Sequence, residues 1–180
     1  MSATHPTPYR HHVLALRILC WIAIVASLLP HFTILFHEEP MVLPTKDGVH
    51  VGSTSDVAMA DRAVLIPVFG LSSIIWIMGL CIVLRIAKRM AAGDVLSTAN
   101  YRSLARFSTC LILMGLVDFV TGPIGLSYLK ARGYVESIDF GKVFPLADSL
   151  DLILAGVFLW LLARIFLHSV SLEEEAKLTV

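Results

Sequence analysis

A carboxylate deep inside an apolar stretch is the residue of this chain best placed to do chemistry. Asp118 lies 14 residues after Leu104, where the stretch begins, so a membrane helix would carry it to about the bilayer centre. An ionised carboxylate at that depth costs at least about 2.5 kcal/mol. Asp118 is either a neutral group that hydrogen-bonds a neighbouring helix or a polar step in an ion or proton path. We expect the neutral, structural role.

Small residues share a helix face with Asp118. They recur at alternating intervals of three and four residues, the spacing of a packing seam: Ser108, Leu111, Gly115, Asp118, Gly122 and Gly125. Glycines in such a seam let a second helix approach closely. Counted from the opposite end of the preceding apolar stretch, Ser72 and Ser73 reach the depth of Asp118. They are therefore candidate hydrogen-bond partners for its carboxyl group.

The histidines and cysteines lack the spacing of a metal or haem site. One group could gather around a divalent ion: His31, His37, Glu38, Glu39 and His50. It contains neither H-x-x-x-H nor H-E-x-x-H. Three cysteines fall in separate apolar stretches, where a thiol acts as a small hydrophobic side chain: Cys20, Cys81 and Cys110. The sequence also has no phosphate loop, serine elbow or C-x-x-C pair, so we expect no metal, no cofactor and no enzymatic activity.

The elements that position these residues are membrane helices. Of the 180 residues, 57% are hydrophobic and 16% charged, whereas soluble domains average about 45–50% apolar and about 25% charged residues. The 14 basic and 14 acidic residues cancel, which leaves no net charge for direct nucleic-acid binding. About 20 apolar residues cross a bilayer as a helix, and four stretches qualify: 13–36, 63–86, 104–129 and 150–167. The sequence predicts an all-α membrane protein, an antiparallel four-helix transmembrane bundle.

The distribution of basic residues predicts the orientation of this bundle. Lysine and arginine in short loops favour the cytoplasmic side. With the N-terminus inside, the inner side holds nine of them and the outer side five. We therefore expect both ends inside: an N-terminal tail (1–12), a four-span membrane domain (13–168) and a C-terminal tail (169–180). The lipid bilayer is then the first partner of the chain.

Two connections between the spans have structural signals of their own. After the first span, β-prone residues flank the hairpin dipeptide Asp47-Gly48, and the run Ser-Thr-Ser-Asp at 53–56 offers N-caps for the next helix. After the second span, Gly93 ends one helix and Ser97 or Thr98 caps the next. The basic and aromatic residues that follow suit either an anionic membrane surface or a docking site for a protein.

Two motifs resemble a known bacterial family. The first, Gly-Asp-Val-Leu-Ser-Thr-Ala-Asn-Tyr-Arg-Ser-Leu at 93–104, is similar to a Gly–x–x–(Phe/Leu)–Ser–x–x–Asn–x–x–x–Leu pattern before the third span. The second, Leu-Glu-Glu-Glu-Ala-Lys-Leu-Thr-Val at 172–180, is similar to a Leu–x–Glu–Glu–x–x–Leu–Thr–(Val/Ile) pattern near the C-terminus. In this order they resemble the family named domain of unknown function 2975. The resemblance implies a four-helix protein of the bacterial cytoplasmic (inner) membrane, with relatives that neighbour small helix-turn-helix regulators.

The motif residues share the expected cytoplasmic face. Those that could bind a partner are Ser97, Asn100, Arg102, Leu172, Glu173, Glu174 and Leu178. The outer and midplane regions offer few convergent polar groups for a substrate. We therefore expect a regulatory or scaffolding membrane protein that holds a cytoplasmic protein, such as a helix-turn-helix regulator. The C-terminal tail either binds that protein or packs on the basic loop. The alternative function is a small transporter or channel subunit built on Asp118.

Overall fold

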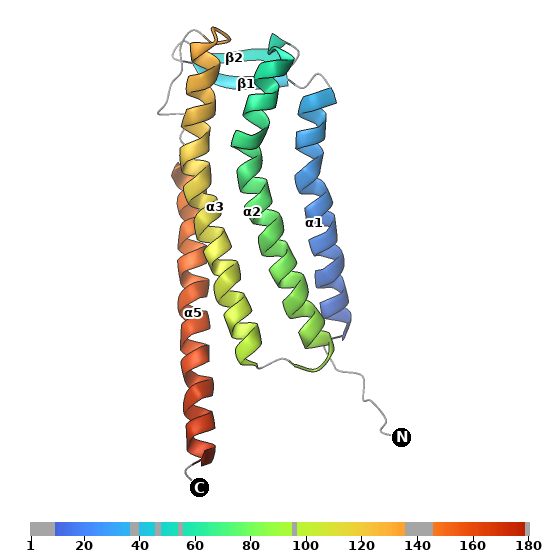
Figure 1. Ribbon diagram of the computed structural model, residues 1–180, viewed down its shortest axis with the longest axis vertical. Coiled ribbons are helices and arrows are strands. Elements are labelled where there is room, and N and C mark those ends of the chain that lie inside the picture. Colours follow the sequence, from blue (N-terminus) through green and yellow to red (C-terminus); the bar gives the residue numbers. More distant parts are fainter. Residues whose placement is uncertain are drawn as a thin grey trace.

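The described part of the computed structural model contains four long helices and one β-hairpin (Figure 1). The helices are α1 (Arg10–Phe36), α2 (Met59–Ala91), α3 (Thr98–Ala131) and α5 (Leu146–Leu178), and the hairpin strands are β1 (Pro40–Thr45) and β2 (Gly48–Ser53). The structure describes residues 10–36, 40–45, 48–53, 56–94, 97–135 and 146–178, with side chains at 11–29, 53, 56–94, 97–135 and 149–170. The helices alternate in direction, so the start of α1, the α2–α3 connection and the end of α5 lie at one end (Figure 1). We call this the basic end, and the opposite end the hairpin end.

All four helices are long and apolar enough to cross a membrane, as the sequence predicts. Each is longer than about 20 residues because polar turns continue it beyond its apolar stretch. Helix α2, for example, has 33 residues and ends on the polar turn of Lys88 and Arg89. The chain is therefore all-helical in its spans and bundle-like in its packing.

The helices pack in chain order, α1 on α2, α2 on α3, and α3 on α5. Figure 1 shows α1 and α5 at opposite sides of this row. Buried apolar side chains form a cluster between α1 and α2 (Cys20, Ile24 and Leu80) and another near the hairpin end (Val57, Leu65, Leu126, Leu129 and Val135). Other large side chains point outward, and Leu19 and Phe158 are each 62% exposed. An apolar exterior of this extent suits lipid, which is as apolar as leucine.

An internal repeat forms the interface between α3 and α5. The pattern Ser-x-x-Leu-Ile-Leu-x-Gly occupies 108–115 in α3 and again 149–156 in α5. Both serines are buried, Ser108 at 0% and Ser149 at 2% exposure. Because the two helices are antiparallel, the two copies face each other with their order reversed.

Each glycine of the repeat receives the other helix. A Cβ at Gly115 would stand 2.7 Å from Cγ1 of Ile153 and 2.7 Å from the carbonyl oxygen of Ser149. A Cβ at Gly156 would stand 2.7 Å from Cγ1 of Ile112 and 2.9 Å from the carbonyl oxygen of Ser108. The two backbones are thus as close as glycine allows, at equivalent points on both helices.

The hairpin predicted after the first span is confirmed. Strands β1 and β2 pair antiparallel, with Pro40 opposite Ser53 and Thr45 opposite Gly48. Gly48 of the predicted turn dipeptide thus begins β2 at the closed end of the ladder, while Asp47 lies outside the described residues.

Local signals at the helix ends succeed at one connection and fail at another. Helix α2 ends before Gly93, which has φ +90°, and Ser97 is the N-cap of α3, as predicted. The prediction of a cap for α2 within 53–56 is wrong, because its N-cap is Ala58 without a side-chain cap bond. Asp56 instead accepts a hydrogen bond from the Ser53 N–H at 2.8 Å. Its carboxylate is therefore used within the turn before the helix.

Candidate functional site

Asp118 lies half-buried near the middle of α3. On the α2 side, Ser72 and Ser73 are also half-buried. Two contacts between α2 and α3 lie on either side of this level, one between Phe69 and Gly125, the other between Gly79 and Phe107. Within the part of the chain that the structure describes, no hydrogen bond joins Asp118 to Ser72 or Ser73.

The residues of the predicted small-residue seam contact two different helices. Gly115 meets α5, whereas Gly125 meets the ring of Phe69 on α2, and a Cβ at Gly122 would have no atom within 4 Å. The reason is helix geometry: ten residues at about 100° each leave Gly125 about 80° from Gly115 around the helix axis. Gly115 and Gly125 therefore serve different interfaces, and Gly122 faces open space.

Asp118→Asn is expected to leave expression and thermal stability nearly unchanged. An amide keeps both a donor and an acceptor, and the side chain is at the edge of the packed surface, so we expect a change within about 0.5 kcal/mol. Thermal unfolding of the purified variant in detergent measures this. A normally folded variant that loses a proton-linked flux in liposomes would instead give Asp118 the transport role.

The α2–α3 connection is held by side chains of the predicted partner-binding set. The Ser97 hydroxyl donates to the Asp94 carboxylate at 3.0 Å and accepts from the Asn100 N–H at 3.3 Å. The buried Asn100 amide donates to the Asp94 carbonyl at 2.6 Å. Ser97 and Asn100 thus stabilise the turn itself, whereas Arg102 is exposed. In this structure, the motif that carries the family resemblance forms local hydrogen bonds across the turn between α2 and α3.

Arg89 joins the end of α2 to the beginning of α3. Its Nη1 donates to the Ala99 carbonyl at 2.9 Å and to the Ser103 hydroxyl at 3.0 Å. Ser103 in turn donates to the same carbonyl at 2.8 Å. These bonds fix the position of a guanidinium group beside the α2–α3 interface.

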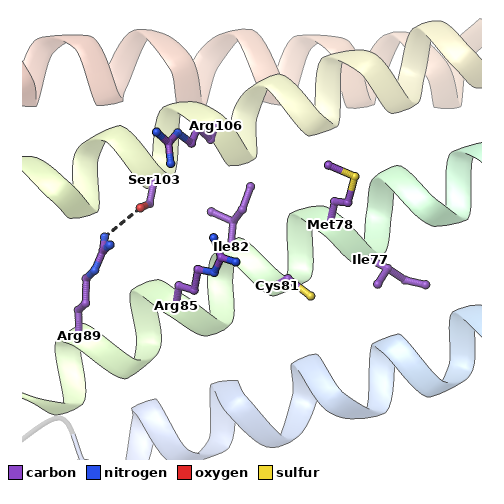
Figure 2. Close-up of a pocket in the computed structure, with 8 residues that line it drawn as sticks. All are labelled: Ile77, Met78, Cys81, Ile82, Arg85, Arg89, Ser103 and Arg106. Atoms are coloured by element: carbon purple, nitrogen blue, oxygen red, sulfur yellow. Dashed lines mark hydrogen bonds between the residues drawn. The ribbon is translucent and has the colours of Figure 1, made fainter.

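A cavity of about 300 Å³ opens beside this guanidinium group. Its lining comes from six residues of α2 and two of α3: Ile77, Met78, Cys81, Ile82, Arg85, Arg89, Ser103 and Arg106 (Figure 2). Figure 2 shows Arg106 reaching from α3 above the turn of α2 that carries Ile82 and Arg85. The cavity is apolar along α2 and basic toward the connection. We call it the arginine cavity.

The C-terminal members of the predicted partner-binding set lie in the last turns of α5, which continues to Leu178. The side chains of Leu172, Glu173, Glu174 and Leu178 are outside the described part. The side chains of the residues that could gather around a divalent ion are also outside the described part: His31, His37, Glu38, Glu39 and His50.

A polar cluster at the hairpin end was not foreseen in the sequence. Asp61, 6% exposed in the first turn of α2, accepts hydrogen bonds from the hydroxyl groups of Tyr128 at 2.6 Å and Tyr134 at 2.7 Å. Nε of Arg132 lies 3.1 Å from the same carboxylate. The Tyr134 hydroxyl also accepts the N–H of Ala58, the N-cap residue of α2. We call Asp61, Tyr128, Arg132 and Tyr134 the tyrosine clasp.

The charges of the clasp differ in their exposure. The Arg132 side chain is 55% exposed and that of Asp61 8%. Nε of Arg132 also donates a hydrogen bond to the Tyr128 hydroxyl at 3.3 Å. This hydrogen bond, and then the charge of Asp61, raise the pKa of the Arg132 guanidinium above its ordinary value. An ion pair with one exposed partner contributes little to stability. The two phenol hydroxyls are therefore the main support of the buried carboxylate.

The tyrosine clasp and the arginine cavity both leave weak signals in the sequence. Tyr128 and Arg132 are four residues apart and so share a helix face, while Asp61 is an acid in the first turn of a helix. Arg85, Arg89 and Arg106 flank a short connection, which must bring them together once the two helices are antiparallel.

No protein-family model, no curated protein and no solved structure matches this chain.

Proposed function

We propose that this chain is a regulatory or scaffolding protein of the bacterial cytoplasmic membrane, with both ends inside, and that it holds a cytoplasmic protein at the basic end. The resemblance to the domain of unknown function 2975 family favours such a role. The observation that carries the proposal is the course of α5, which runs past the α2–α3 connection (Figure 1).

Helix α5 is as long as α2 and α3, which have 33 and 34 residues, but it is displaced toward the basic end (Figure 1). Its 33 residues span about 50 Å at 1.5 Å per residue, against a hydrocarbon core of about 30 Å. Its last turns contain Glu173, Glu174 and Lys177 and continue past the α2–α3 connection (Figure 1). We call residues 171–178 the α5 extension. A helix that leaves the bundle in this way supplies a surface for a soluble partner, and its course favours this over packing on the basic loop.

The base of the α5 extension is anchored to α3. Tyr101, in the first turn of α3, stacks on Phe166 of α5 with ring centroids 5.3 Å apart and an interplanar angle of 11°. Such pairs contribute about 0.5–1.5 kcal/mol beyond their buried area. A change in helix packing inside the membrane would therefore reach the extension through a fixed contact, which suits a regulatory role.

Removal of residues 172–180 tests the proposal. We expect the truncated chain to insert and fold normally, since the spans are intact, but to lose the partner that the full chain crosslinks in cells. Crosslinking, affinity purification and mass spectrometry compare the two chains. A matched control removes residues 2–8 at the same end of the molecule and should keep the partner. If the full and truncated chains capture the same proteins and give the same expression profile, the proposal fails.

A further inference from the structure

All the charged side chains that line the arginine cavity are basic. Arg85, Arg89 and Arg106 line it, and none of the eight lining residues is acidic. Neither Arg85 nor Arg106 donates a hydrogen bond to another residue within the described ranges. Like charges that converge without an acid between them repel one another, unless an anion lies among them.

Arg89 supplies donors that are already fixed in place. Both of its hydrogen bonds to Ala99 and Ser103 come from Nη1, and a guanidinium carries five N–H donors in a rigid fork. Nε and Nη2 therefore keep three N–H groups that no described residue accepts. A planar fork of this kind matches the oxygens of a phosphate group.

The apolar half of the cavity extends along α2 in the other direction. Ile77, Met78, Cys81 and Ile82 line it, and Ile77 is twelve residues from Arg89, about 18 Å along a helix. The lining thus changes from basic to apolar over the length of a lipid headgroup and the first part of its chain. A soluble anion would have no contact with the apolar half.

We propose that the arginine cavity is a binding site for one anionic phospholipid, with the headgroup phosphate among Arg85, Arg89 and Arg106 and an acyl chain over Ile77 and Met78. At about 300 Å³, the cavity holds the phosphate and the neighbouring part of a chain, and the rest of the lipid stays in the bilayer. The site differs from general attraction to an anionic leaflet because it depends on three particular side chains. It also stands independently of the proposed function, since it involves neither the α5 extension nor a protein partner.

Native mass spectrometry of the full-length protein in detergent, titrated with phosphatidylglycerol, tests the site. We expect one retained lipid per chain, and for Arg85→Gln/Arg106→Gln a loss of affinity of at least about tenfold, because each cation near an anionic headgroup contributes about a factor of five. The matched control is Lys88→Gln/Arg102→Gln, which removes two exposed charges at the same end, outside the cavity lining. We expect the control to bind within about twofold of the parent, since neither side chain lines the cavity or contacts the headgroup directly.

Three results would overturn the proposal. Equal losses in the two double variants would mean diffuse attraction, and equal retention of phosphatidylcholine would mean that the charge is not recognised. Displacement of phosphatidylglycerol by equimolar glycerol phosphate or inorganic phosphate would make the site one for a soluble anion. Circular dichroism checks the helicity of each variant. If the double variant does not fold, the single variants Arg85→Gln and Arg106→Gln replace it, each with an expected loss of about three- to fivefold.

Discussion

The substitution Gly156→Leu is expected to separate α3 from α5 and to cause a large loss of stability. A Cβ at Gly156 would already stand 2.9 Å from the carbonyl oxygen of Ser108 and 3.0 Å from the backbone nitrogen of Ile112. Backbone atoms cannot turn aside as side chains do, so the whole helix must move. Overpacking usually costs about 1–3 kcal/mol, and Gly156→Leu should reach or exceed the upper value. Unfolding of the purified protein in a detergent titration measures the change.

Gly122→Ala is the matched control for that experiment. Both positions are glycines inside a membrane helix, but a Cβ at 122 has no neighbour within 4 Å. In a helix, alanine is favoured over glycine by about 1 kcal/mol, so this variant should be as stable as the parent or more stable. If Gly156→Leu is no less stable than Gly122→Ala, the close approach of α3 and α5 is not present in the membrane.

Removal of both phenol hydroxyls of the tyrosine clasp should release the hairpin end. In Tyr128→Phe/Tyr134→Phe the buried carboxylate of Asp61 loses two hydrogen bonds of 2.6 and 2.7 Å, and hydrogen bonds to charged groups contribute about 1.5–3 kcal/mol each. We expect a total loss of about 3 kcal/mol or more. Each hydroxyl also accepts one further hydrogen bond, at Tyr134 from the Ala58 N–H at 3.0 Å and at Tyr128 from Nε of Arg132 at 3.3 Å, so each single phenylalanine variant should lose part of this total. Hydrogen exchange at the beginning of α2, together with unfolding, measures both effects.

Arg132→Gln separates the ion pair from these hydrogen bonds. The guanidinium is more than half exposed, and such pairs contribute about 0–1 kcal/mol, so the variant should remain close to the parent in stability. A loss as large as that of the double tyrosine variant would mean that the charge of Arg132, rather than the hydroxyl groups, stabilises Asp61.

The sequence predicts those parts of the fold that depend on neighbours along the chain. The four apolar helices follow from composition and length, the hairpin from Asp47-Gly48, and the α2–α3 connection from Gly93 and Ser97. Each of these signals acts over a few residues, through burial, turn geometry or capping. The cap expected for α2 is absent, and the N–H of its N-cap residue Ala58 instead binds the hydroxyl of Tyr134, 76 residues away.

The sites depend on the rotation of each helix about its axis, which no local pattern sets. Heptad spacing placed Gly115 and Gly125 on one seam, but the 3.6-residue period turns them toward different neighbours. Likewise, Asp61 meets Tyr128 across 67 residues and Tyr134 across 73. Arg89 and Ser103, by contrast, are 14 residues apart across a short connection. That pair, and the cavity beside it, could have been predicted by pairing the two helices from the connection outward.

The repeat that joins α3 to α5 also bears on how the chain is made. Helix α3 precedes α5 in the chain, so the groove at Gly115 is synthesised before the surface that fills it. The complementary surface is on α5, and the two copies of Ser-x-x-Leu-Ile-Leu-x-Gly match when the helices run in opposite directions. An α5 inserted the wrong way round presents Ile153 and Gly156 in reversed order and cannot fill that groove. The close contacts at Gly115 and Gly156 are therefore expected only when the two helices run in opposite directions.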